Sequence, residues 1–274
     1  MAELKPYRGG YYLWNYLPST PAAIIFLILF LLITGAVAWR MYKTKTWFCS
    51  VFVIGGMFEV IGFAGRATAH DKTDKLMPFV IQNSFILLAP VLFAASIYMV
   101  LRRVIIQAHG EALSIIPVKW LTKIFVMGDV VSFMVQGSAA GLMATGDNAA
   151  LGQNIIIGGL FIQIIVFGFF MVTTVIFQTR MRKSPTTEST DPSNPWESQI
   201  YMLHACSVLI LVRSTFRVIE FIMGHDGYLL LHEWPLYVFD AVLMFFVMVI
   251  FFVRYPVPGD RRASKDGLIP LQSV

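Results

Sequence analysis

Ionisable side chains lie inside or at the ends of long apolar stretches of this sequence, and amide side chains lie in the same stretches. The ionisable residues are Glu59, Arg66, Asp129, Arg213, Arg217, Glu220 and Asp240, and the amides are Gln82, Asn83 and Gln136. A charged group in a membrane-spanning helix is costly unless it is paired or wetted, so such groups often mark function. The chemistry available here is ion pairing and hydrogen bonding to a polar headgroup.

Helical spacing places several of these charges on shared faces. Glu59 and Arg66 are seven residues apart, and Arg213, Arg217 and Glu220 follow an i, i+4, i+7 pattern. Lipid cannot satisfy such groups, so these faces should point into the interior of a bundle. We expect the residues of these two helices to face one another, in a network of ion pairs that also includes Asp129 and Asp240. The alternative is that such a network only locks the helices together.

Seven apolar runs must position these side chains. They cover roughly 21–39, 47–65, 79–101, 119–143, 154–178, 200–223 and 234–253. Each is close to the ~20 residues that cross the hydrocarbon core of a bilayer. Of the 274 residues only 14% are charged, against about 25% in a soluble domain. The sequence therefore predicts an all-α polytopic membrane protein, a bundle of seven transmembrane helices.

Lys and Arg are unevenly shared among the loops, being abundant in the first, third and fifth loops and absent around Asp147 and Asp226. The positive-inside rule then places the N-terminus outside and the C-terminus in the cytoplasm. Residues 1–20 would form an extracellular segment, 21–254 the transmembrane domain and 255–274 a cytoplasmic tail. The net charge of +5 reflects these loops rather than a nucleic-acid partner. We expect an integral protein of the plasma membrane.

This orientation converts sequence position into depth, at ~1.5 Å per helical residue. The ionisable and amide residues named above then fall in the middle or outer half of the bundle, where we expect ligand binding. Asp129 and Asp240 are the best candidates for a cationic headgroup, because neither has a basic residue one turn away on its own helix. Glu220 does have one, in Arg217.

Other signals are weaker. Gly137 and Gly141 form a G-x-x-x-G pattern, which indicates close helix packing within the bundle, with a homodimer interface as the alternative. Pro90 should kink the third helix. His204 is a lone histidine inside a span, and such a residue usually has a hydrogen-bond partner in the interior. The sequence contains no pair of histidines at i, i+4, so a buried zinc site is not expected. With no nucleophile elbow or phosphate loop either, we expect no metal, no cofactor and no enzymatic activity.

Short motifs in order along residues 16–254 carry a family resemblance. They are Tyr16-Leu17-Pro18-Ser19, Glu59-x-x-Gly62-Phe63-x-x-Arg66, Leu88-Ala89-Pro90, Ala94-Ala95-Ser96-Ile97-Tyr98, Gly128-Asp129 with Gln136, Gln163, Arg213-x-x-Phe216-Arg217-x-x-Glu220 with Gly224, and Glu233 with Tyr237-x-x-Asp240. Together they resemble the fungal RTA-like family of lipid-translocating exporters, named for aminocholesterol resistance. Phe63 replaces the tyrosine usual in that family, which puts in doubt any hydrogen bond made by that hydroxyl.

The resemblance implies seven spans, an external N-terminus, and export or flipping of lipids such as sphingoid long-chain bases. Some members of the family are linked to resistance against sterol-like drugs or to porphyrin handling. The functional hypothesis is therefore a protein that binds and translocates or exports amphipathic lipids, either sphingoid bases or sterol-like compounds. The alternative is a seven-helix lipid receptor or sensor without transport activity.

Overall fold

The computed structural model describes Trp14 and residues 16–69, 75–145, 149–190, 195–224 and 227–256. All regular structure in these ranges is helical, which confirms the all-α prediction. The first helices are α1 (Thr20–Thr44), η1 (Trp47–Cys49), α2 (Ser50–Ala69), α3 (Leu76–Gln107), η2 (Glu111–Leu113), α4 (Val118–Thr145), α5 (Ala149–Lys183) and α6 (Trp196–Met223). The last helical run comprises α7 (Tyr228–Leu231), α8 (Trp234–Leu236), the π-helical segment η3 (Tyr237–Val242) and α9 (Leu243–Val253).

The polarity of the bundle is that of an integral membrane protein. Five helical segments in the described ranges are long and apolar enough to cross a membrane: Thr20–Thr44, Trp47–Ala69, Leu76–Gln107, Leu151–Lys183 and Trp234–Val253. Large apolar side chains face outward, as Leu32 and Ile165 do at 65% and 68% exposure, whereas the side chain of Arg66 is fully buried. Water would penalise this distribution, and hydrocarbon favours it.

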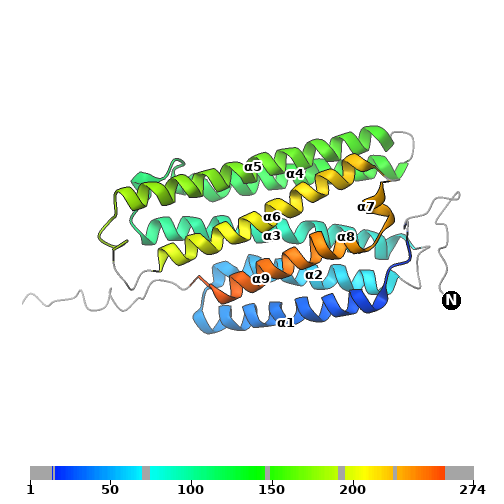
Figure 1. The fold of residues 1–274 in the computed structure, drawn as a ribbon, viewed down its shortest axis with the longest axis horizontal. Coiled ribbons are helices and arrows are strands. Elements are labelled where there is room, and N and C mark those ends of the chain that lie inside the picture. The colour runs from blue at the N-terminus through cyan, green and yellow to red at the C-terminus, as the bar shows by residue number, and fades with distance from the viewer. Residues whose placement is uncertain are drawn as a thin grey trace, which may run out of the picture.

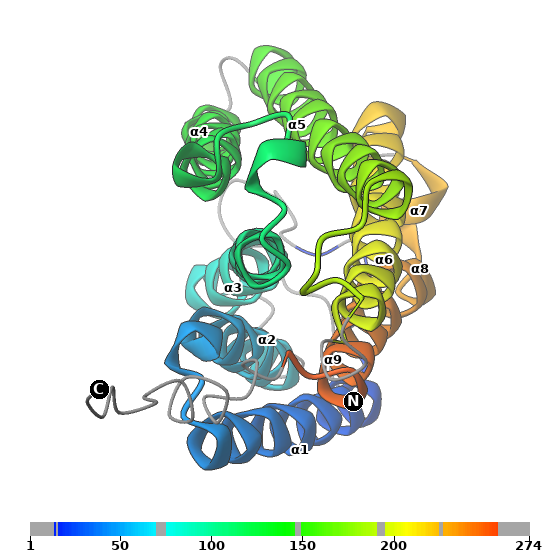
Figure 2. The ribbon, with the colours of Figure 1, turned by 90° about the vertical axis from the view of Figure 1, so that its left-hand side faces the viewer.

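The long helices form a closed ring. Each of α1 to α6 packs on the next helix along the chain, α6 packs on α9, and α9 returns to α1 (Figure 2). Helix α3 also packs against α6 across the ring. The helices run along the long axis of the molecule, and α1 begins at the same end at which α6 ends and α7 lies (Figure 1). We call this end the Ser19 end, after the residue that precedes α1.

Small residues bring α2 close to its neighbour α3. A Cβ atom added to Gly62 would lie 2.5 Å from the Ile86 side chain, and one added to Gly55 would lie 2.8 Å from the Phe93 ring. Phe93 in turn packs against Phe52, with ring centroids 4.7 Å apart. The hydrophobic effect does not drive helices together within a membrane, so close packing at small residues is what stabilises this contact. It fixes the α2 face on which Glu59 lies, one turn from Gly62.

Some expectations fall outside the described residues or need correction. The segments 1–20 and 255–274 are largely outside them. Gly137 was expected to pack closely within the bundle, which is wrong, because no atom lies within 4 Å of a Cβ placed there. Gly141 lies outside the residues whose packing is described. His204 does have an interior partner, as its Nε2 lies 3.0 Å from the Gln178 side-chain oxygen.

Candidate functional site

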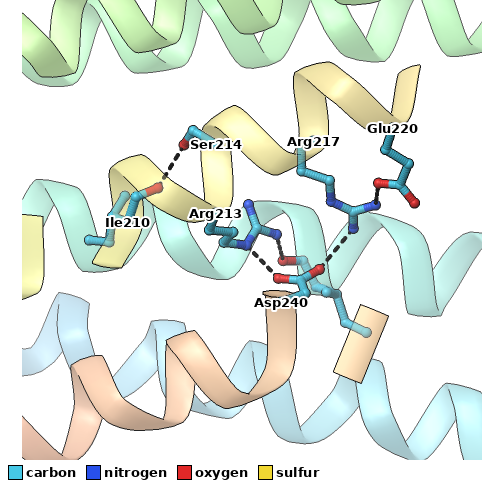
Figure 3. Close-up of polar contacts among 7 residues, drawn as sticks. Ile210, Arg213, Ser214, Arg217, Glu220 and Asp240 are labelled. Atoms are coloured by element: carbon cyan, nitrogen blue, oxygen red, sulfur yellow. Dashed lines mark hydrogen bonds and ion pairs between the residues drawn. The ribbon is translucent and has the colours of Figure 1, made fainter. Parts of the chain in front are cut away.

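Asp240 holds two arginines of α6, as Figure 3 shows. The Arg213 Nε donates to one carboxylate oxygen, and the Arg217 Nη2 donates to the other at 2.9 Å. Asp240 is 2% exposed and lies within the π-helical segment η3. Such segments are rare and are frequent at functional sites. Asp240 is thus a buried carboxylate shared by two guanidinium groups.

A second carboxylate balances the charge of this cluster. The Arg217 Nη1 donates to the Glu220 Oε2 at 2.8 Å, an i, i+3 pair along α6. Arg217 therefore bridges Glu220 and Asp240. The network of Arg213, Arg217, Glu220 and Asp240 contains two positive and two negative groups, all of them paired. The predicted ion-pair network among the helices is confirmed for these four residues.

Pro90 contributes to this network through a backbone acceptor. Proline has no N–H group, so the carbonyl four residues earlier in a helix lacks its usual donor. In α3 that carbonyl belongs to Ile86, and the Arg213 Nη2 donates to it at 3.1 Å. Arg213 is therefore satisfied on two sides, by the Asp240 carboxylate and by a carbonyl that the helix leaves free. Pro90 thereby links α3 to α6 without ending α3.

Arg66, at the Ser19 end of α2, belongs to a separate cluster. Its Nη2 donates to Glu233 at 2.7 Å and to the Tyr16 hydroxyl at 3.1 Å, and its Nε donates to the Tyr237 hydroxyl at 3.0 Å. The Glu233 carboxylate also accepts the Ser19 N–H at 2.8 Å. This cluster ties the segment before α1 to α2 and to the start of the last helical run.

The prediction that Arg66 meets the arginines and Glu220 of α6 is therefore wrong. Arg66 lies about 10 Å along α2 from Glu59, at ~1.5 Å per residue. At that position it contacts the segment before α1 and the start of the last helical run, and the spacing of residues within α2 does not predict either contact. Its ion-pair partner, Glu233, stood out in the sequence only through the family resemblance. Phe63, between them on α2, stacks on Phe26 with centroids 5.7 Å apart.

Asp240, the other candidate for a cationic headgroup, is already paired with Arg213 and Arg217. Its own helix carries no basic residue one turn away, and both of its partners come from α6. Asp129 differs. It is 2% exposed, one of its oxygens accepts the Tyr98 hydroxyl at 2.8 Å, and the other is buried with no hydrogen-bond partner. Among the described residues no basic group pairs with it.

The predicted amides divide between two regions. Gln136 donates to Ser132 at 3.0 Å and to Gln163 of α5 at 3.3 Å, while Ser132 donates to the Gly159 carbonyl. These bonds join α4 to α5. On α3, Gln82 is buried with its side-chain oxygen unpartnered, and Asn83 is half-buried. Ser132 and Gly159 were not foreseen, since neither residue type is unusual in an apolar helix.

Glu59 is the remaining predicted residue. It is 1% exposed, and one of its carboxylate oxygens is buried without a hydrogen-bond partner. It lies within electrostatic range of Asp240, Arg213 and Arg217, but it forms no ion pair in the described part of the chain. The structure thus offers a paired ion network and two carboxylates, Glu59 and Asp129, each with an unused oxygen.

Comparison with known proteins identifies the family. Residues 52–259 match the family described as RTA1 like protein. Protein RTA1 of Saccharomyces cerevisiae is 34% identical over 97% of this chain and 92% of its own length. Protoporphyrin uptake protein 1 of the same yeast is 33% identical over 89% of this chain and 92% of its own length. Sphingoid long-chain base transporter RSB1, also from S. cerevisiae, is 26% identical over 85% and 69% respectively. No solved structure matches the chain. The chain therefore belongs to the RTA1-like family of membrane proteins.

Proposed function

We propose that this protein binds an amphipathic lipid with a cationic headgroup and carries it across the membrane. Two relatives are named for the transport of sphingoid long-chain bases and the uptake of protoporphyrin, so transport of amphipathic molecules is the function that the family suggests. A sphingoid base has an amine and hydroxyls at one end and an apolar tail, and a sterol-like amine has the same division. The protein acts by binding and movement, without catalysing a reaction.

The observation that carries this proposal is the unused oxygen of Asp129. A headgroup leaves water only where equivalent hydrogen bonds await it, and a carboxylate with a free oxygen is a strong acceptor for an ammonium group. Tyr98 already donates to the other oxygen, which fixes the orientation of the carboxylate. The unpartnered oxygen of Gln82 is not part of this site, because Gln82 lies ~24 Å along α3 from Tyr98 at ~1.5 Å per residue. The paired groups around Asp240 serve the scaffold in this scheme.

The topology proposed with this function has seven membrane crossings, the N-terminus outside and the C-terminus in the cytoplasm of a cell whose plasma membrane holds the protein. The seventh crossing is the run from α8 through η3 to α9. The polar clusters at the Ser19 end then lie in the outer half of the membrane, so a headgroup would enter or leave on that side.

The test is a flux assay in liposomes that contain only this protein, with a labelled sphingoid base. Asp129→Asn keeps the shape of the side chain and removes its charge. A charge-assisted hydrogen bond contributes ~1.5–3 kcal/mol, so binding should weaken by about 10- to 100-fold. Glu197→Gln, which changes an exposed carboxylate, is the matched control and should bind and transport as the parent does.

Two outcomes would contradict the proposal at different points. Equal affinity of the parent and Asp129→Asn for the amine lipid would remove Asp129 from the site. Tight binding that depends on Asp129, without any movement of lipid, would instead assign the protein to the receptor or sensor class. Tyr98→Phe removes the hydroxyl that orients Asp129 and leaves the charge of the carboxylate in place. It should therefore reduce affinity for the lipid less than Asp129→Asn does.

A further inference from the structure

Glu59 is a buried acid for which the described part of the chain provides no partner. It is 1% exposed, and its Oε1 has no hydrogen-bond donor. The nearest basic residue on its own helix, Arg66, is held by Glu233 and two tyrosines. A buried carboxylate that is neither paired nor hydrogen-bonded is disfavoured in its charged form. Glu59 is thus unlike Asp240, which has two guanidinium groups.

Helix packing places Glu59 beside the ion network. Glu59 and Gly62 are three residues apart and share a face of α2. Gly62 contacts Ile86 of α3, and the Ile86 carbonyl accepts a hydrogen bond from Arg213. Glu59 is accordingly within electrostatic range of Arg213, Arg217 and Asp240. Geometry thus brings an unpaired acid next to a paired arginine without joining them.

Charge balance sets the protonation state of Glu59. Arg213 and Arg217 supply two positive charges, and Asp240 and Glu220 supply two negative charges that pair with them. A charged Glu59 would add a third negative charge with no cation to offset it. A protonated Glu59 leaves the buried cluster neutral. In the observed arrangement of ion pairs, the neutral acid is the form that burial permits.

The other helices around Glu59 supply no spare cation. Helix α1 has no titratable side chain over residues 20–39, and α9 has none at all. Helix α3 has none before Tyr98, whose hydroxyl donates to Asp129. The other titratable group of η3 is Tyr237, which accepts a hydrogen bond from Arg66. The only cations facing Glu59 from these helices and α6 are therefore the two arginines already paired with Asp240.

We propose that Glu59 is a proton-binding site whose deprotonation transfers Arg213 from Asp240 to Glu59. The O–H bond of the acid breaks, the proton passes to water, and the new carboxylate pairs with the Arg213 guanidinium. Asp240 and Glu220 then share Arg217, so every carboxylate has a guanidinium neighbour, and the cluster carries one net negative charge that the neutral acid avoids. Arg213, and not Arg217, changes its partner, because its bond to the Ile86 carbonyl keeps its guanidinium group beside the α2 face that carries Glu59.

The consequence is a link between proton binding and the contacts among α2, α6 and η3. The sequence contains no phosphate-binding loop for a nucleotide. If the proposed lipid transport is correct, a proton gradient acting at Glu59 is the energy source that these residues can use. The proton site itself does not rest on that function, and it is tested without any lipid substrate.

The experiment is infrared difference spectroscopy of the purified full-length protein in lipid nanodiscs. At neutral pH the parent should show the C=O stretch of a protonated carboxylic acid, and Glu59→Gln should lose one carboxyl group's share of that signal. Raising the pH should remove the same share from the parent and leave Glu59→Gln without that change. Glu197→Gln, at an exposed position paired with Arg182, is the control and should match the parent throughout.

An unchanged signal in Glu59→Gln, or no protonated acid in the parent, would overturn the proposal. Thermal stability provides a second readout. Glutamine has the shape and neutrality of a protonated glutamate, so Glu59→Gln should fold and melt at neutral pH as the parent does. Failure to fold, or a large fall in melting temperature, would mean that Glu59 is charged and paired, which also overturns the proposal. Neither measurement depends on whether Asp129 binds an amine.

Discussion

Asp240→Asn should destabilise the protein strongly, because Asp240 is the shared partner of two buried arginines. The substitution leaves the volume nearly unchanged and removes the charge. Arg217 retains Glu220 at 2.8 Å, whereas Arg213 retains only the Ile86 carbonyl at 3.1 Å. One arginine is thus left without a counter-charge. Breaking one buried pair typically costs ~3–5 kcal/mol, so the expected loss is about that for one pair rather than twice as much.

The chain contains a probe for the measurement. Cys49 and Cys206 are free and buried, so a thiol-reactive dye reports their exposure as the protein unfolds in detergent or nanodiscs. At ~2–4 °C per kcal/mol, the melting temperature of Asp240→Asn should fall by about 6–20 °C. The control is Glu197→Gln, whose ion pair with Arg182 is 48% exposed on both sides and should contribute at most ~1 kcal/mol.

Similar melting temperatures for Asp240→Asn and Glu197→Gln would contradict this expectation, since burial would then make no difference to an ion pair. The double variant Arg213→Met with Asp240→Leu adds a stricter check. It leaves no buried charge unpaired, so it should recover much of the stability that Asp240→Asn loses. A double variant less stable than Asp240→Asn would show that packing, rather than an orphaned charge, accounts for the loss.

Two further predictions concern Pro90 and the topology. Replacing a proline inside a helix with alanine ordinarily gains ~3 kcal/mol, but Pro90→Ala should gain much less in a melting experiment, because Arg213 already satisfies the Ile86 carbonyl; a full gain would show that this bond contributes nothing. An epitope tag placed after Val274 should be labelled by antibody only in permeabilised cells, because the basic loops predict a cytoplasmic C-terminus; labelling of intact cells would reverse the orientation.

Local spacing predicted the parts of the site that lie within one helix. The helical runs and the Arg217–Glu220 pair follow from periodicity, because residues three or four apart on a helix are neighbours whatever the fold. The Asp240–Arg213 and Arg66–Glu233 pairs join segments 27 and 167 residues apart, and periodicity cannot determine which helices are adjacent.

The division of the buried charges into paired and unpaired groups was therefore beyond the sequence. Depth along each helix predicts that Glu59, Asp129 and Asp240 share one zone of the bundle, and all three are buried. Asp129, however, accepts from Tyr98, which lies ~18 Å along α3 from Ile86, the residue beside the Arg213–Asp240 pair. Whether Asp240 is paired depends on the rotation of α6 about its axis, and α6 packs against α3 and η3. The unused oxygens of Glu59 and Asp129 are visible only once those rotations are known.

The bond from Arg213 to the Ile86 carbonyl also restricts how α6 can move against α3. Along an uninterrupted helix every interior carbonyl is occupied by the N–H four residues later, so a side chain that slides past it finds no vacant acceptor. Pro90 creates a single vacancy on α3 at Ile86. A shift of α6 by one turn would strand Arg213, whereas a tilt centred on this contact would preserve the bond. A movement of α6 against α3 that keeps this hydrogen bond is therefore a rotation about the contact at Ile86 and not a translation along α3. The position of Pro90 in the sequence thus determines the axis of that rotation.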